Sequence, residues 1–186
     1  MIEESEIGKK IKKFRKTKGI TLQELGRKTG LTKGYLSKIE NSDKAPPIST
    51  LITVAKALNL SISDVFGVTE GKSHITIVKK NERPFIARNG STFGYAYQAL
   101  AHKFPNKCME PFLLTLPVKP KQNALFQHKG EELLFVLGGT MRFVYGEEEF
   151  LVEEGDCIYF DASIAHYGVS QKGKEVKCLM VIYTPE

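Results

Sequence analysis

The sequence predicts an α+β protein of two domains, a five-helix bundle followed by an all-β barrel or sandwich. The spacing of apolar residues changes from a helical period to a strand period of two near residue 74. The formal net charge of +6 falls in the first third of the chain. A length of 186 residues lets each part bury its own core. We therefore expect domains at residues 1–66 and 74–186, joined by a glycine-containing linker at 67–73.

Residues 21–41 have the pattern of two short helices joined by a turn. Thr21 and Thr32 carry hydroxyl groups suited to cap the two helix starts, and Gly30 stands at the bend. Apolar residues are three apart within each helix, so each helix presents one face to a shared core. These apolar residues are Leu22, Leu25, Leu36 and Ile39. The segment therefore predicts a helix-turn-helix.

The other face of the second helix is polar and suited to nucleic acid. It carries Lys33, Tyr35, Ser37 and Lys38. Lysine side chains bind phosphate, and hydroxyl groups can meet base edges in a DNA groove. This mixture is what a recognition helix requires.

The distribution of charge supports the same interpretation. Residues 1–66 contain 13 Lys or Arg against 7 Asp or Glu, whereas residues 67–186 contain 14 of each. A localised excess of cations is typical of a polyanion-binding module attached to a neutral one. The excess centres on a predicted first helix, whose cations we expect to point outward. They are Lys9, Lys10, Lys12, Lys13, Arg15, Lys16 and Lys18.

Two more helices complete the predicted bundle. Residues 48–58 have apolar side chains at helical spacing, and residues 61–66 begin with Ser61 as a cap and Asp64 three residues later. Residues 7–66 resemble the phage-repressor-like helix-turn-helix domains of the xenobiotic response element family, most clearly through GITLQELGRKTGLTKGYLSKIEN. The resemblance implies that Gln23 contacts a phosphate. It also implies a set of residues that face the DNA groove, namely Thr32, Lys33, Tyr35, Ser37 and Lys38.

The second half of the chain reads as a series of short strands separated by turns. Predicted strands cover residues 74–78, 112–116, 133–137, 141–145, 150–152, 157–160 and 176–183. Hairpin turns are expected at Gly138-Gly139 and at residues 145–147. Three cysteines without CxxC spacing indicate neither a disulfide framework nor a zinc knuckle, and we expect them to be buried apolar residues.

Two of the four histidines, and one glutamate, stand at the ends of predicted strands. These residues are His128, Glu132 and His166. Two imidazoles and one carboxylate can bind Fe(II) or a similar divalent ion and leave three positions open. A tight turn between His128 and Glu132 would bring both side chains to one mouth of a barrel. The candidate cofactor is a divalent Fe, Zn, Mn or Ni ion.

The region around these residues, about 112–183, resembles the cupin motifs. The first motif maps onto Phe126, His128, Glu132 and Gly139, with Phe126 in place of the first histidine. The second motif maps onto Gly155, Asp161, Ser163 and His166, with only its ends intact. The resemblance implies a double-stranded β-helix barrel. It leaves two alternatives open, a barrel that has lost its ion and a barrel that binds an ion with three ligands.

The layout of the whole chain also resembles hydroxypropylphosphonate epoxidase, a helix-turn-helix plus cupin enzyme. That resemblance implies iron bound by His128, Glu132 and His166, and a substrate approach near residues 81–84 and 95–97. Leu125 and Phe126 replace polar residues expected before the first ligand, which should weaken binding of an anionic substrate. Residues that would line an effector pocket are Arg88, Tyr95, Tyr97 and Phe126.

We expect a sequence-specific DNA-binding transcriptional regulator whose barrel binds a small-molecule effector. A single head of this size contacts one half-site, so we expect a homodimer through the barrels, or a higher assembly. An iron-dependent cupin oxygenase or epoxidase is the alternative. The sequence shows neither a signal peptide nor a membrane-spanning run, so we expect a cytoplasmic protein without a membrane partner.

Overall fold

The computed structural model describes residues 4–66, 74–87, 94–105, 107–119 and 125–185. The chain forms two compact units. The helical unit comprises residues 1–77 with 102–106, and the β unit comprises residues 78–101 with 107–186. The predicted linker at 67–73 lies outside the described residues, so the domain boundaries stay predictions.

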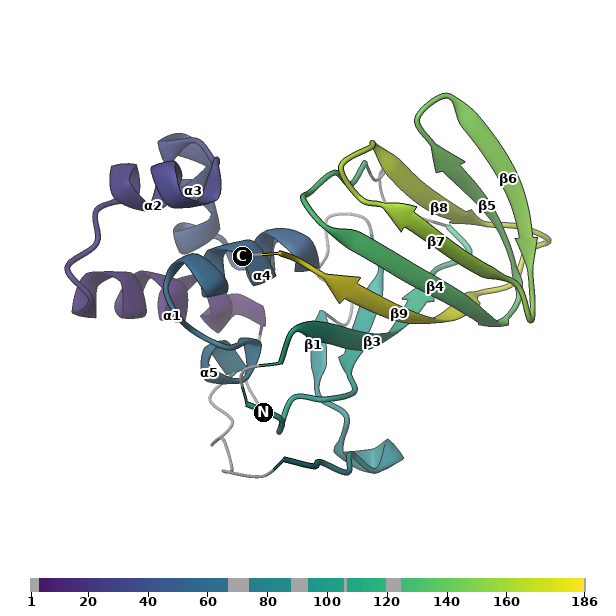
Figure 1. The fold of residues 1–186 in the computed structure, drawn as a ribbon, viewed down its shortest axis with the longest axis horizontal. Helices are drawn as coiled ribbons and strands as arrows, with labels where there is room; N and C mark the ends of the chain where they lie inside the picture. The colour runs from purple at the N-terminus through teal and green to yellow at the C-terminus, as the bar shows by residue number, and fades with distance from the viewer. Residues whose placement is uncertain (1–3, 67–73, 88–93, 106, 120–124, 186) are drawn as a thin grey trace. The chain divides into compact units, whose positions relative to one another are not determined.

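The helical unit contains four helices of eight or more residues and a fifth of about one turn (Figure 1). They are α1 (Glu4–Thr17), α2 (Leu22–Thr29), α3 (Lys33–Asn41), α4 (Ile48–Ala57) and α5 (Ile62–Phe66). The predicted helix starts are confirmed. Thr21 and Glu24 form a reciprocal capping box, and the Thr32 hydroxyl accepts a hydrogen bond from the Tyr35 amide. Gly30 ends α2 at a φ of 74°, a left-handed conformation that glycine adopts at low cost.

Close packing of α1 against α3 holds the second helix of the helix-turn-helix in place. A Cβ atom on Gly8 would lie 2.3 Å from the backbone oxygen of Ile39, so only glycine allows the two backbones to approach this closely. Ile7 and Ile11 on α1 are buried, as are Leu25 and Leu36 in the helix-turn-helix. Burial of such side chains contributes about 1.5–3 kcal/mol each to folding. The position of α3 is therefore fixed by packing.

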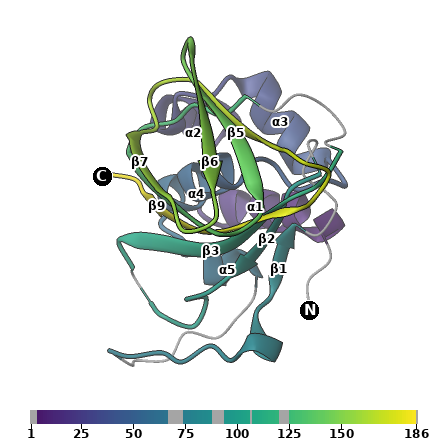
Figure 2. The same ribbon diagram turned by 90° about the vertical axis from the view of Figure 1, so that its right-hand side faces the viewer.

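The β unit contains nine described strands in two sheets (Figure 1, Figure 2). The six-stranded sheet has the order β1-β2-β3-β9-β4-β7, and the three-stranded sheet has the order β6-β5-β8. The strands of the first sheet are β1 (Phe85–Ala87), β2 (Ala96–Ala99), β3 (Met109–Leu116), β9 (Val176–Tyr183), β4 (Glu131–Gly138) and β7 (Cys157–Asp161). Those of the second are β6 (Glu148–Glu153), β5 (Thr140–Tyr145) and β8 (His166–Ser170). A short 3-10 helix, η1 (Lys80–Glu82), precedes β1.

The inner faces of the two sheets meet in an apolar core. Buried and less buried residues alternate along β3 and β9, as expected for strands with one face toward a core. Phe143 of the small sheet contacts Phe160 of the large sheet, with 5.1 Å between ring centroids. This arrangement is consistent with a cupin barrel. None of the helices in the described ranges is long and apolar enough to span a lipid bilayer.

Several predictions for this half need correction. Residues 74–78 do not form a strand, and Ile75 and Ile77 are 73% and 74% exposed. Alternating Ile and Thr fits a strand, but the β-propensity of a segment depends on its packing context and does not determine a strand alone. Cys108 and Cys157 are exposed and only Cys178 is buried, so the expectation for the cysteines was wrong at two positions. The predicted hairpin turn at residues 145–147 is confirmed, because β5 pairs with β6 across it and Gly146 has a positive φ. The hairpin predicted at Gly138-Gly139 was wrong, since this turn connects β4 to β5, which belong to different sheets.

Candidate metal centre and helix-turn-helix

Pairing of an irregular segment with the start of β8 brings His128 next to His166. Phe126 and His166 exchange two backbone hydrogen bonds of 2.9 Å each, and the His128 amide donates to the Ala162 carbonyl at 2.8 Å. These bonds hold residues 126–128 as an additional edge beside β8. Two histidines that are 38 positions apart in the chain therefore lie side by side.

The turn between His128 and Glu132 depends on Gly130. This glycine has a φ of 108°, and a Cβ atom there would lie 2.0 Å from the backbone oxygen of Tyr183. Its own carbonyl accepts a hydrogen bond from the Ala162 amide. The chain can thus turn tightly against the end of β9 and enter β4 with Glu132 on the inner face.

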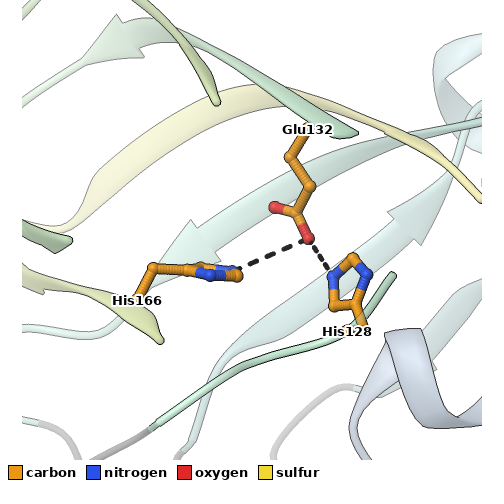
Figure 3. Close-up of side chains that lie close together, drawn as sticks. All are labelled: His128, Glu132 and His166. Atoms are coloured by element: carbon orange, nitrogen blue, oxygen red, sulfur yellow. Dashed lines mark hydrogen bonds and ion pairs between the residues drawn. The ribbon is translucent and has the colours of Figure 1, made fainter. Parts of the chain in front are cut away.

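The three predicted metal-ligating side chains converge in the β unit (Figure 3). Nε2 of His128 lies 2.6 Å from Oε1 of Glu132, and Nε2 of His166 lies 3.8 Å from the same oxygen. One donor atom from each residue lies within 4.8 Å of the others. Glu132 and His166 are 3% and 4% exposed. A buried carboxylate beside two imidazoles is costly without a compensating cation or proton.

A hydrogen bond from Nδ1 to a backbone carbonyl orients each of the two imidazoles. Nδ1 of His166 lies 2.8 Å from the Ile164 carbonyl, and Nδ1 of His128 lies 3.1 Å from the Lys129 carbonyl. A carbonyl only accepts hydrogen bonds, so each Nδ1 carries the hydrogen. In the neutral imidazole the lone pair then lies on Nε2, the atom directed at Glu132. Such outer hydrogen bonds are typical of metal-binding histidines, and the donor set fits a divalent ion.

The two histidines differ in their preference for a proton. Burial lowers the pKa of the His128 imidazole, but its hydrogen bond to Glu132 and the charge of that carboxylate outweigh burial, so the net pKa is raised. Burial dominates at His166 and lowers its pKa, and the attraction of Glu132 only partly offsets it. Of the two rings, His128 therefore binds a proton more readily than His166.

Aromatic rings surround the three residues. The ring centroids of Phe126 and Phe160 lie 6.2 and 4.8 Å from that of His166. Tyr95 lies next to Phe126 at 5.7 Å, and its hydroxyl donates to the Gly168 carbonyl at 2.6 Å. Burial, together with Tyr95 and Glu132, raises the pKa of Tyr97 well above its ordinary value. Both tyrosine hydroxyls therefore stay neutral inside the unit.

The other predicted site residues of the β unit are placed differently. Arg88 lies outside the described residues, so its predicted pocket role stays a prediction. Asp161 and Ser163, which match altered positions of the second motif, form an exposed turn in which the Ser163 amide donates to the Asp161 carboxylate. This hydrogen bond lowers the pKa of Asp161. Neither residue belongs to the cluster of His128, Glu132 and His166.

The structure leaves most of the predicted reading face of α3 open to solvent. Lys33 and Lys38 are exposed, as is Gln23 at the start of α2, while Tyr35 and Ser37 are half-buried. Thr32 is exposed, but its hydroxyl already accepts the Tyr35 amide at 3.2 Å as the helix cap. Its structural role was visible in the sequence. The Thr32 hydroxyl keeps its own hydrogen, so it can still donate a hydrogen bond while it caps the helix.

Comparison with known proteins supports both halves of this description. A family model for a helix-turn-helix matches residues 11–65, and a cupin domain model matches residues 112–182. The uncharacterized HTH-type transcriptional regulator y4dJ of Sinorhizobium fredii is 30% identical over 83 residues, which cover 44% of this chain and 92% of that protein. The chain belongs to the HTH-type transcriptional regulators. It is a DNA-binding regulator with a helix-turn-helix domain and a cupin domain.

More distant likeness extends over the whole regulator. The HTH-type transcriptional regulator PuuR of Escherichia coli is 24% identical over 159 residues, 86% of this chain and 84% of PuuR. An HTH_3 family transcriptional regulator from Vibrio cholerae has the same fold, with a TM-score of 0.63, 22% identity and coverage of 99% and 98% of the two chains. Hydroxypropylphosphonic acid epoxidase from S. wedmorenis has a TM-score of 0.50 at 19% identity, with coverage of 97% and 98%. At these identities the two structures show the fold alone.

One buried ion pair in the regulator corrects the predicted cation cluster. Arg15 is 8% exposed and makes two hydrogen bonds of 2.5 and 2.9 Å to the carboxylate of Glu40, at the end of α3. It also donates to the Ile20 carbonyl at 2.8 Å. Arg15 therefore does not point outward for DNA, because it ties α1 to α3. Nothing in the run of lysines around Arg15 indicates that this one cation is buried. The available signal was Glu40, because a carboxylate on the inner face of a predicted helix needs a partner.

Proposed function

We propose that the β unit holds a divalent ion through His128, Glu132 and His166 and uses it to bind a small-molecule effector. The observation that carries this proposal is the convergence of two Nε2 atoms on one buried carboxylate. When bound, the ion supplies a Lewis-acidic centre with open positions for effector oxygen or nitrogen atoms. The aromatic side chains of Tyr95, Tyr97 and Phe126 are the proposed lining for the rest of the effector. Arg88 is proposed with them from the sequence alone.

We further propose that α3 lies in the major groove of DNA. Lys33 and Lys38 would neutralise phosphates, Tyr35 and Ser37 would face base edges, and Gln23 and Thr32 would fix the register through the backbone. Exposure of the three longest polar side chains among these supports the assignment. A homodimer would present two such helices about one helical turn apart.

An effector would control DNA binding if its binding to the β unit changes the spacing of the two helix-turn-helix domains in the dimer. Such coupling is commonly worth about 1–3 kcal/mol, or about 5–150-fold in DNA affinity. The DNA in turn must change the affinity of the β unit for its ligand by the same factor. The coupling can therefore be measured either as a change in DNA affinity on effector binding or as a change in effector affinity on DNA binding.

Metal analysis combined with DNA binding tests this proposal. Purified protein, His166→Ala and His74→Ala would be loaded with Co(II), desalted, and analysed for metal per chain. His74 is an exposed histidine and serves as the matched control. We expect about one ion per chain in the wild type and the control, and a loss of about tenfold or more in affinity for the ion in His166→Ala. Equal metal content in all three proteins would contradict the site.

The same three proteins can test coupling. DNA affinity would be measured on a genomic fragment library with and without Co(II). We expect a change in affinity for the wild type and His74→Ala, and none for His166→Ala. An unchanged affinity in all three would show that the ion does not control the DNA-binding heads.

Iron-dependent oxidation of a small acid is the second candidate function. The donor set and the whole-chain fold likeness to the epoxidase favour it. The apolar residues Leu125, which is 65% exposed, and Phe126 are unsuited to bind an anionic group. Oxygen consumption by the Fe(II)-loaded protein with added hydroxyphosphonate decides between the two. Our proposal predicts no turnover, whereas stoichiometric product would establish the enzyme.

A further inference from the structure

The outer face of the six-stranded sheet is apolar through its middle. Register places two rows of outward side chains side by side across β7, β4, β9 and β3. The first row is Cys157, Phe135, Leu179 and Leu113, and the second is Tyr159, Leu133, Val181 and Pro111. Phe135 is 37% exposed and Tyr159 is 64% exposed. We call these eight residues the outer apolar rows.

Among the outward residues of β4, β7 and β9, charged side chains occur only beyond the two rows, toward the ends of the strands. Lys177 lies at one end, where β9 pairs with the end of β4. Glu131 and Asp161 lie opposite one another in the strand register at the other end of the strands, next to Tyr183. Lys177 and Tyr183 are six residue steps apart along β9, a distance of about 20 Å at about 3.3 Å per residue. The face thus has a positive end, an apolar middle and a negative end.

The outer face of the three-stranded sheet differs in this respect. Arg142 on β5 forms an ion pair with Glu149 on β6, with 2.6 Å between Nη1 and Oε1. Leu151 is exposed beside them, paired in register with Arg142. Charges in the middle of a face are typical of a surface in water, whereas the cores of protein interfaces are depleted of them. Only the first of the two faces has the composition of an interface.

We propose that the outer apolar rows are covered by a second copy of this chain in a two-fold homodimer. A two-fold axis in the plane of contact and perpendicular to the strands reverses the face along the strand direction. It therefore lays β9 over the partner's β9, so that Lys177 comes over the partner's Tyr183. The partner's Glu131 is one strand spacing away, about 4.8 Å, which a lysine side chain can span to form an ion pair. The face is complementary in charge to itself, and each dimer contains this ion pair twice.

The size of the face suits such a dimer. Strands β2, β3, β9, β4 and β7 at about 4.8 Å spacing and about 3.3 Å per residue give a flat area of about 500 Å². Because side chains protrude from the sheet, the accessible area exceeds the flat area and approaches the roughly 800 Å² per partner that a stable interface buries. Two facing sheets pack about 10 Å apart with interdigitating side chains, as in a β-sandwich.

This interface rests on the proposed function in one respect, because it supplies the pairing of β units that would bring two DNA-binding heads together. The dimer itself can be tested without DNA. Three variants of the full chain carry the charge test, Lys177→Glu, Glu131→Lys and the double variant. Sedimentation equilibrium would give the dimer dissociation constant of each, and circular dichroism would check that each is folded.

Like charges facing one another across an interface oppose association. We expect each single variant to weaken dimerisation by about tenfold or more, and the double variant to restore it to within about threefold of the wild type. Glu131 also accepts a hydrogen bond from the Tyr159 hydroxyl within one chain. Both variants at residue 131 lose that bond, so restoration in the double variant isolates the contact between copies. Single variants that dimerise like the wild type, or a double variant that stays weak, would overturn the proposal.

The apolar middle has its own test. Phe135→Lys should give monomers, while Leu151→Lys on the other sheet should leave the dimer intact. Alkylation of Cys157 in the wild type should accelerate on dilution, as the dimer dissociates. Slow alkylation at every concentration in a monomeric protein would mean that the same chain covers the face, and would overturn the proposal. Loss of DNA binding in Lys38→Ala with an intact dimer would bear on the DNA-binding role alone.

Discussion

The proton on each imidazole decides what the residues of the proposed metal centre can bind. Backbone carbonyls accept from Nδ1 of His128 and His166, which leaves Nε2 of both rings directed at Glu132. A proton on Nε2 of His128 and a divalent ion compete for one position, because both neutralise the same carboxylate. The sequence could suggest the three ligands, but not which ring nitrogen faces inward, since that follows from backbone carbonyls brought by the fold.

Competition with a proton predicts that metal affinity falls with pH. The pKa of His128 is raised and that of His166 is lowered, so only His128 must lose a proton at mildly acidic pH. We expect Co(II) affinity to fall by about tenfold per pH unit below the raised pKa of His128. Without metal, the ion pair with Glu132 stabilises the fold below the ordinary pKa of histidine and is lost as pH rises through the raised value. Co(II) absorbance titrations across this range would measure the slope, and a pH-independent affinity would refute the competition.

The Arg15 and Glu40 pair gives a prediction about stability. Arg15→Met leaves the Glu40 carboxylate buried without its cation, and the loss of one partner of a buried pair costs about 3–5 kcal/mol. Urea unfolding followed by helical circular dichroism would measure the change. The double variant Arg15→Met with Glu40→Leu should recover most of the loss, because no buried charge remains. A single variant as stable as the wild type would show that the pair contributes nothing.

At the scale of elements, the turn into β4 controls the geometry of the candidate centre. Gly130→Ala forces a Cβ atom onto the Tyr183 carbonyl, whereas Gly155, also at positive φ, has no atom within 4 Å of a built Cβ. Gly155→Ala therefore measures the conformational cost alone, about 1 kcal/mol. We expect Gly130→Ala to cost more than this and to weaken Co(II) binding by about tenfold, as His128 and Glu132 separate. Equal effects of the two substitutions would exclude a steric role for Gly130.

The elements also show where reasoning from sequence succeeds. Helix starts were predictable because a hydroxyl cap and a glutamate three residues later act locally, as at Thr21 and Glu24. Strand β9 was predicted with its observed bounds because residues 176–183 form a nearly continuous apolar run of strand length. The strand predicted at residues 74–78 was wrong because alternation of β-branched residues alone does not determine a strand. The edge formed by Phe126 was missed because two hydrogen bonds to His166 leave no periodic pattern.

At the scale of the whole molecule, the separation of charge in the sequence matches its division into two units. The helical unit carries the excess of positive charge and the exposed face of α3, while the β unit holds the buried His and Glu cluster. A fold of this kind serves regulators and an enzyme alike, so function rests on the sites. The family shows the DNA-binding function.

Salt dependence of DNA binding tests the central claim that α3 of the helical unit binds duplex DNA. Fluorescence anisotropy with a genomic fragment library would compare the wild type, the double variant Lys33→Ala with Lys38→Ala, and a matched control with Lys119→Ala and Lys174→Ala in the β unit. We expect the α3 variant to bind more weakly and to lower the slope of log affinity against log salt by about 1 for each lysine removed. The control should keep both affinity and slope. An α3 variant that binds DNA with the wild-type affinity and slope would contradict the claim.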